Sequence, residues 1–498
     1  MLHASACILK FHARRVLRRR LSLALISFFP LTGWATNDVA LGPLYHEFRL
    51  TLAPGHRQEA LGPLYYDEQR EEVKTRAVPP LFSWTQDAGT DSGEFDFLYP
   101  ILTYDRFGRE YRWQFLQLLS LSGGKSNAET DDHRFTLFPF YFQQRSSNPA
   151  KNYSAFIPFY GHLKNRLLRD EVKFVMMPLY VQSRKRDIVT DNFVYPFFHL
   201  RHGNGLKGWQ LWPLVGAEHK NVTTKTNIWD EIETLPGHEK FFAAWPFFLR
   251  QTAGLGTDNP ERHLAVLPLF TTLRSPQRDS STYLWPFGLT LTDDREKKYH
   301  EWGLPWPMVV FARGEGKTTS RIWPLFSQSH NDTLQSDFYL WPLYKFNRVH
   351  SDPLDRQRTR ILFFLYSDLS EKNTETGGEF RRRDAWPLFT ARRDFDGHER
   401  WQFLSILEPL LPNNKSIERN YSPLWSLWRA EKDARSGATS QSAFWNLYRR
   451  DTTPESKKYS LLFGLFQYQV GAAGKRWRLF YIPLGKMKTA EPPPHRPT

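Results

Sequence analysis

A proline flanked by large apolar residues recurs along almost the whole 498-residue chain, and this repeat constrains the fold more than any other feature of the sequence. Residues 40–45 (Ala-Leu-Gly-Pro-Leu-Tyr) recur unchanged at 60–65, and degenerate copies follow to the end of the chain, mostly about 16 to 22 residues apart. The clearest repeat positions are Pro43, Pro63, Pro139, Pro158, Pro178, Pro196, Pro246, Pro268, Trp323, Pro324, Trp341, Pro342, Trp386 and Pro387. Self-similarity at this spacing predicts a repeat architecture.

Each repeat unit favours a strand over a helix. A proline at the apolar centre would remove a helical hydrogen bond and clash one turn back. The centres are rich in aromatic and branched residues, and the connectors are polar and contain glycine, as strands and hairpin turns require. Between Tyr111 and Leu121, the residues Tyr111, Trp113 and Phe115 alternate with Arg112 and Gln114, which is the period of a strand.

We therefore predict an all-β fold: an antiparallel up-and-down meander of about 20–24 strands. No helical pattern of ten or more residues separates the strands, so parallel crossovers are not expected. Free sheet edges invite aggregation, and closure into a barrel-like ring would remove them. The prolines are expected at the centres of the strands, where each removes one hydrogen-bond donor and kinks the strand as a bulge would.

The chain is expected to consist of a signal peptide at 1–35, one β-repeat domain at 36–485 and a proline-rich disordered tail at 486–498. Arginines precede a short apolar stretch at 21–29, and Gly33 and Ala35 supply the small residues of a cleavage site. An uncleaved anchor and twin-arginine export remain open. Cys7 is the only cysteine, so the exported chain would form no disulfide.

In strand number, unit length and aromatic content, the sequence resembles bacterial outer-membrane β-barrel proteins. The resemblance covers the whole mature chain, but it rests on pattern and not on a specific motif. It implies strands that cross a membrane, with aromatic girdles and polar turns. The sequence departs from that class in its repeated prolines, in centres that are apolar on both faces such as 338–346, and in a polar tail without a terminal aromatic strand.

No catalytic, cofactor or metal signature is found, so we expect no enzyme activity, no cofactor and no metal. The sequence at 123–126 lacks the first glycine of a phosphate-binding loop, because residue 119 is leucine. His238-Glu239 and His300-Glu301 lack the second histidine of a zinc-protease helix. A hydrolase whose catalytic groups come from distant strands remains open.

The net charge of +15 and basic runs such as Arg381-Arg382-Arg383 and Arg392-Arg393 suit anionic head groups or lipopolysaccharide phosphates. Solvated strand ends explain these runs equally well. We therefore expect an exported, non-enzymatic cell-envelope protein at the bacterial outer membrane or in the periplasm that contacts lipid or an apolar ligand and binds no nucleic acid. The alternative is a soluble periplasmic binding module for an apolar or anionic lipid or glycan ligand. Trp341 and Trp386 are expected in a buried core.

Overall fold

The computed structural model describes residues 40–125, 131–226, 229–472, 474–480 and 482–484. They belong to one compact unit that begins at Ala40. The signal peptide predicted for 1–35 and the tail predicted for 486–498 lie outside the described residues.

The structure is built almost entirely of short strands, most of them five to eight residues long. The first half of the chain contains β1 (His46–Arg49), β2 (Gly55–Ala60), β3 (Tyr65–Arg70), β4 (Val73–Val78), β5 (Phe82–Asp87), β6 (Ser92–Phe97), β7 (Leu102–Phe107), β8 (Glu110–Phe115), β9 (Leu119–Gly123), β10 (Asp132–Leu137), β11 (Tyr141–Ser146), β12 (Tyr153–Phe156), β13 (Tyr160–Arg166), β14 (Arg169–Val175), β15 (Tyr180–Lys185), β16 (Ile188–Phe193), β17 (Phe198–Gly203), β18 (Leu206–Leu211), β19 (Val215–Lys220), β20 (Thr223–Thr226), β21 (Ile232–Leu235), β22 (Gly237–Ala243) and β23 (Phe248–Leu255).

The second half continues with β24 (Glu261–Val266), β25 (Phe270–Arg274), β26 (Arg278–Tyr283), β27 (Leu289–Asp294), β28 (Tyr299–Gly303), β29 (Val309–Gly314), β30 (Thr318–Ile322), β31 (Phe326–His330), β32 (Leu334–Tyr339), β33 (Tyr344–Ser351), β34 (Leu354–Ile361), β35 (Tyr366–Asn373), β36 (Glu379–Ala385), β37 (Phe389–Arg393), β38 (Glu399–Phe403), β39 (Trp428–Lys432), β40 (Thr439–Ala443), β41 (Tyr448–Thr452), β42 (Ser456–Leu461), β43 (Phe466–Gly471), β44 (Gly474–Leu479) and β45 (Ile482–Leu484). The helices are η1 (Gly42–Leu44), η2 (Gly62–Leu64), η3 (Pro149–Lys151), α2 (Lys415–Asn420) and α3 (Ser422–Trp425). Among the described residues, no helix is long and apolar enough to cross a membrane.

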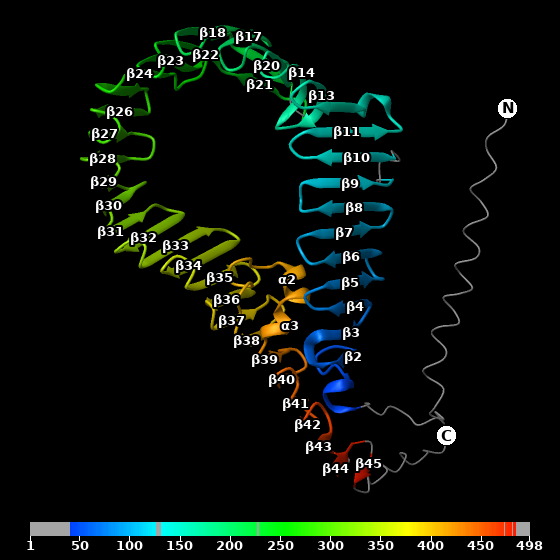
Figure 1. The fold of residues 1–498 in the computed structure, drawn as a ribbon. Coiled ribbons are helices and arrows are strands. Elements are labelled where there is room, and N and C mark those ends of the chain that lie inside the picture. Colours follow the sequence, from blue (N-terminus) through cyan, green and yellow to red (C-terminus); the bar gives the residue numbers. More distant parts are fainter. Residues whose placement is uncertain (1–39, 126–130, 227–228, 473, 481, 485–498) are drawn as a thin grey trace, which may run out of the picture. The chain divides into compact units, whose positions relative to one another are not determined.

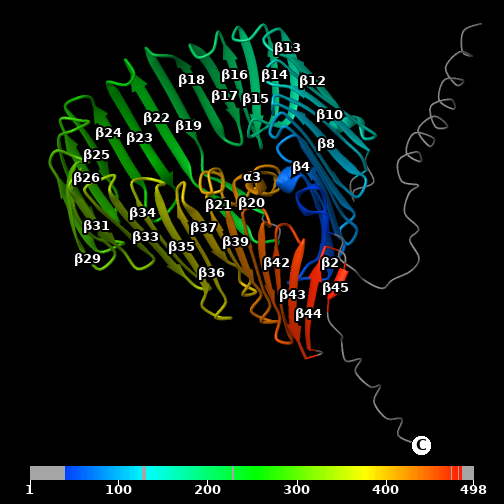
Figure 2. The same cartoon turned by 60° about the horizontal axis from the view of Figure 1, so that its bottom comes forward.

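The predicted all-β antiparallel meander is confirmed. In the described part of the chain, forty-three strands form one sheet in which each strand pairs with its neighbours in sequence, and only the hairpin β20–β21 stands apart from it. Figures 1 and 2 show the strands side by side in a single curved layer. The predicted number of 20–24 strands is wrong by about a factor of two. Each repeat unit forms a hairpin of two strands, because its proline lies in a turn and not within a strand.

The predicted closure into a barrel by strand pairing is not found in the described part of the chain. There, β1 pairs only with β2, and β45 pairs only with β44. Instead, the first strands meet the last third of the sheet through side chains. The segment 404–427, which carries α2 and α3, lies against β4 and β5, as Figure 1 shows. We call this contact the seam.

The two faces of the sheet differ in packing. We call the face of the sheet on which Asp96 bonds to Arg419 the inner face. The opposite face is the outer face. The main apolar core lies on the inner face of β11 to β14 and consists of Phe142, Tyr153, Ala155, Leu163, Val172 and Phe174. Gly161 belongs to this core because a Cβ there would lie 2.4 Å from the Cβ of Ala155.

Candidate functional site

The prolines of the repeat lie in the turns along one rim of the sheet. In the hairpin β10–β11, the amide of Phe140 donates to the carbonyl of Leu137 at 2.8 Å, and Pro139 occupies the position between them that needs no donor. The same placement, with a cis peptide bond before the proline, holds for Pro139, Pro158, Pro178, Pro196, Pro246, Pro268, Pro324, Pro342 and Pro387. The predicted kinks at mid-strand are therefore wrong. A residue without an N–H group disrupts a ladder but fits a turn.

The first two prolines differ from the rest. Pro43 lies in η1 and Pro63 in η2, two single-turn 3₁₀ helices near the seam. The exact repeat at 40–45 and 60–65 thus marks the start of the sheet and not its regular hairpins.

Neighbouring turns of this rim are joined by backbone hydrogen bonds. The amide of Phe138 donates to the carbonyl of Leu118 at 2.8 Å, and that of Ile157 donates to Phe140 at 2.7 Å. Farther along, Leu267 donates to Phe247 at 2.7 Å, and Trp323 donates to Met308 at 2.8 Å. Backbone amides and carbonyls of neighbouring turns thus form hydrogen bonds with one another. This removes the main cost of placing irregular backbone in hydrocarbon, which is unpaired polar groups.

The side chains of these turns are large, apolar and exposed. Phe140 is 55% exposed, and Leu284 is 68% exposed. The same character is shared by Leu118, Phe138, Phe159, Met176, Leu179, Val194, Tyr195, Phe197, Leu214, Trp245, Phe247, Leu269, Trp285, Phe287, Leu304, Trp323, Leu325, Leu340, Trp341, Leu343, Phe363, Phe364, Leu388, Phe444 and Leu462. We call this edge the apolar rim. An exposed apolar surface of this extent marks an interaction site.

The outer face beside the apolar rim continues its character. From β5 to β15, cross-strand pairing connects Phe82, Phe97, Leu102, Phe115, Leu119, Leu137, Tyr141, Phe156, Tyr160, Val175 and Tyr180 in one row. From β29 to β38, the row is Val309, Ile322, Phe326, Tyr339, Tyr344, Ile361, Tyr366, Ala385, Phe389 and Phe403. The row two residues farther from the rim mixes apolar and polar residues.

The outer face is charged toward the opposite rim. We call the row beside the apolar rim the apolar row. Four positions along the strands from it, cross-strand pairing connects Lys164, Glu171, Arg184, Val189, His202, Lys207, His219 and Glu239. The turns of that opposite rim are mostly polar, as at 295–298 and 331–333, and we call it the polar rim. The ribbon is therefore amphipathic along its strands, with one apolar edge and one charged edge.

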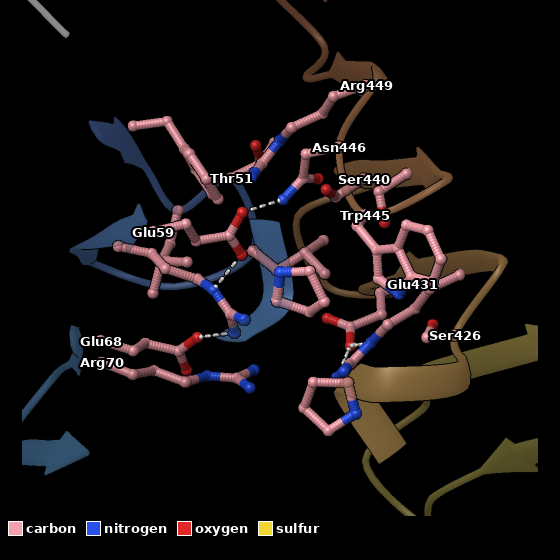
Figure 3. Close-up of a pocket in the computed structure, with 18 of the residues that line it drawn as sticks. Thr51, Glu59, Glu68, Arg70, Ser426, Glu431, Ser440, Trp445, Asn446 and Arg449 are labelled. Atoms are coloured by element: carbon pink, nitrogen blue, oxygen red, sulfur yellow. Dashed lines mark hydrogen bonds and ion pairs between the residues drawn. The ribbon is translucent and has the colours of Figure 1, made fainter. Parts of the chain in front are cut away.

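A second candidate site is a polar pocket of about 130 Å³ at the seam (Figure 3). On one side, Arg57 contacts Glu59 at 2.7 Å and Glu68 at 2.8 Å. On the other side, Asn446 donates to Glu59 at 2.5 Å, and Figure 3 shows this bond crossing the pocket. The guanidinium of Arg449 lies 3.6 Å from the ring centre of Phe48.

Burial and neighbouring charges shift the pKa values of Glu431 and Tyr66, two residues at the seam. Burial alone would raise the pKa of Glu431, but the guanidinium groups of Arg429 and Arg400 outweigh it and lower this pKa to about 2. Burial raises the pKa of Tyr66 to about 12, with Glu68 adding to the effect and Arg57 opposing it. A paired carboxylate with so low a pKa is a poor general base. The hydrogen bond from Asn446 to Glu59 joins the turn between β40 and β41 to β2.

Near-miss motifs in the sequence form no metal centre. Neighbouring residues of a strand point to opposite faces, so His238 contacts Glu218 at 2.6 Å while Glu239 contacts His219 at 3.2 Å. No cluster of three or more histidine, cysteine, aspartate or glutamate side chains suited to a metal occurs in the described ranges.

The tryptophans of the repeat lie at the apolar rim. Trp323 and Trp341 are each 42% exposed, with ring centres 6.0 Å apart. Trp386 is more buried, and its Nε1 donates to the carbonyl of Ile406 at 3.0 Å. The expectation of a buried core at Trp341 is wrong, because a turn side chain of a single-layered sheet has no second layer to cover it.

Alternation also divides the basic runs. Arg381 and Arg383 lie on the outer face, whereas Arg382 is on the inner face, 4% exposed, and bonded to Asp384 and to the carbonyl of Glu408. The seam residues Arg57, Glu59, Asp96 and Arg419 were not singled out in the sequence. No local pattern connects residues more than 300 positions apart.

A search of protein-family models and of curated proteins finds no match to this sequence.

Proposed function

We propose that the protein is a non-enzymatic component of a bacterial cell envelope that associates with a membrane through its apolar rim. The observation that supports this proposal is the continuous edge of exposed turns. There, large apolar side chains are exposed, while backbone amides are hydrogen-bonded to neighbouring turns. Both properties favour transfer into hydrocarbon. Export by a signal peptide at 1–35 and location at the outer membrane or in the periplasm belong to this proposal.

The dimensions favour insertion into one leaflet over a full crossing. A membrane-spanning strand needs about 9–11 residues, whereas strands such as β10 and β31 have six and five. The rim turn and the two nearest outer rows extend about 12 Å at a rise of about 3.4 Å per residue. That depth is close to the roughly 15 Å of hydrocarbon in one leaflet.

The charges suit the same orientation. With the apolar rim in the leaflet, the outer row that holds Lys164, Arg184 and Lys207 stands at or above the head groups. Cations at this height attract anionic lipids or lipopolysaccharide phosphates. A barrel-like ring closed by the seam, and not by strand pairing, is the form in which we propose that the sheet stands on the membrane.

The alternative, a soluble periplasmic binding module, is favoured by one specific observation. A cavity of about 520 Å³ lies at β22 to β26 and is lined by Phe242, Leu249, Leu273 and polar residues. Its size and mixed lining fit a small apolar ligand with a polar group. A hydrolase on the same scaffold would require an acid–base pair in such a cavity.

Flotation with lipid vesicles tests the proposal. The wild-type chain should float with the vesicles, and a variant with Phe138→Ser, Phe140→Ser, Trp323→Ser and Leu325→Ser should float markedly less. The matched control removes two exposed leucines from the polar rim, Leu167→Ser and Leu168→Ser, which are 64% and 92% exposed. This control should float like the wild type. Equal loss in both variants, or no flotation of the wild type, would contradict membrane association through the apolar rim and favour the binding module.

A further inference from the structure

The inner face of β33 to β35 carries a group of cations without matching anions. Arg356, Arg358 and Arg360 alternate along β34 and point to this face. Lys345 on β33 is the direct cross-strand partner of Arg360, and Asn347 is the partner of Arg358. Directly opposed side chains lie about 5 Å apart, and residues two positions apart on a strand lie about 7 Å apart. Four cations therefore share a small area.

Among the described residues, only one of these four cations has an ion pair. Arg356 contacts Glu371 at 3.0 Å. No carboxylate of the described ranges lies within 4 Å of Lys345, Arg358 or Arg360. Nearby Arg382 is already matched by Asp384 at 2.9 Å. The excess of positive charge is thus local to β33 and β34.

The two free arginines are also incompletely hydrogen-bonded. The Nε atoms of Arg358 and Arg360 are buried and have no partner in the described structure. A buried donor without an acceptor costs about 1–3 kcal/mol, and more for a charged group. Burial lowers the pKa of Arg358, and the neighbouring guanidinium groups of Arg360 and Arg356 lower it further. An oxyanion with several acceptor oxygens would relieve both the repulsion and the missing hydrogen bonds.

We propose that Lys345, Arg358 and Arg360 form a binding site for a phosphate group. Phosphate suits this arrangement better than a carboxylate because it accepts bidentate hydrogen bonds from more than one guanidinium. Asn347 lies beside Arg358, but its Nδ2 already donates to Ser336 at 3.0 Å, so the phosphate would be held by the three cations. The phosphate could come from an anionic lipid head group or from a free phosphorylated molecule, since Arg360 lies next to Ile361 in the apolar row and Arg358 lies one inner-face position farther from the rim.

The site is tested first without membranes, so that the result does not depend on rim insertion. The melting temperature of the full chain is measured in inorganic phosphate and in chloride at equal ionic strength. Binding to the folded state should raise it. Arg358→Gln combined with Arg360→Gln should abolish the phosphate-dependent rise and weaken phosphate binding at least tenfold. The control, Arg383→Gln on the outer face of β36, should retain the rise.

Without phosphate, the double variant should melt at the wild-type temperature or higher, because it removes an unfavourable repulsion. No phosphate-dependent rise in the wild type, a rise that survives the double substitution, or a double variant that does not fold would each overturn the proposal. The last result would show that these cations stabilise the fold by internal contacts.

Vesicles then identify the source of the phosphate. If it is a lipid head group, vesicles of phosphatidylcholine with phosphatidic acid should bind the wild type more tightly than phosphatidylcholine alone, and the double variant should lose that difference. If the difference persists in the double variant, the site takes a free phosphorylated molecule. Failure of all vesicle binding would contradict the membrane proposal and leave the phosphate result standing.

Discussion

Arg419 and Asp96 form an ion pair with an Nη2 to Oδ2 distance of 3.0 Å, although they lie 323 positions apart in the chain. Asp96 is 3% exposed and also accepts from Asn420 at 3.0 Å and from Ser83 at 3.2 Å. Arg419 is part of α2, and Asp96 is part of β6. This pair therefore stands at the centre of the seam, where the sheet meets itself without strand pairing.

The first prediction concerns this pair. Asp96→Ala would leave the buried guanidinium of Arg419 with Glu94 as its remaining carboxylate, and removing one partner of a buried pair costs about 3 kcal/mol or more. Denaturant unfolding should show a loss of this size. Arg76→Ala is the control, because Arg76 pairs with Asp67 on the exposed surface, and such pairs contribute about 0–1 kcal/mol. Equal, small losses in both variants would mean that the seam does not stabilise the fold.

The second prediction separates two neighbouring arginines. Arg382→Ala should destabilise the folded protein by about 3 kcal/mol. It leaves the buried carboxylate of Asp384 without its guanidinium partner and the carbonyl of Glu408 without its hydrogen bond. Arg381→Ala removes only a partly exposed pair with Asp368 and should cost less than about 1 kcal/mol. Chemical unfolding of both variants measures the difference. A larger loss for Arg381→Ala would contradict the assignment of the two faces.

The third prediction concerns the pH dependence of stability. The pKa of Glu431 is lowered to about 2 in the folded protein, from an ordinary value near 4.5. A depressed folded pKa contributes stability that is fully present above about pH 4.5 and is lost as pH falls toward about 2. The contribution is about 3.5 kcal/mol at most, because the pKa is lowered by about 2.5 units and each unit corresponds to about 1.4 kcal/mol.

The measurement compares the wild type with Glu431→Gln from pH 3 to pH 7. The difference in unfolding free energy should be largest and constant above about pH 4.5 and should shrink below it. A difference that is independent of pH over this range would show that the charge of Glu431 does not stabilise the seam.

The sequence pattern predicted the strands, their antiparallel order and the repeat correctly. It placed the prolines at strand centres and not in turns, for a definite reason. In β8–β9, a turn of three residues separates Phe115 from Leu119, and these two residues are paired across the hairpin. An odd-numbered turn keeps the alternation in phase, so Leu119 and Leu121 lie on the face of Tyr111, Trp113 and Phe115 although the chain reverses between them. Periodicity alone therefore cannot distinguish a hairpin from one long strand.

The seam and the basic site could not be predicted from local sequence. Arg419 and Asp96 come together only because more than thirty strands carry the chain round to its beginning. The excess charge at Arg358 and Arg360 depends on the register that brings Lys345 beside Arg360. Arg382 illustrates the same limit: its run of three arginines suggested an exposed cluster, yet alternation buries the middle one.

Membrane association through the apolar rim is tested most directly by measuring depth. Cys7, the only cysteine, is replaced by serine, and an environment-sensitive NBD fluorophore is attached at Leu325→Cys on the apolar rim or at Asp332→Cys on the polar rim. With anionic vesicles, the label at position 325 should shift its emission to the blue and be quenched by lipids that carry a nitroxide in the acyl chain, whereas the label at position 332 should show neither effect. Equal responses at both positions, or none at position 325, would contradict insertion of the apolar rim into one leaflet.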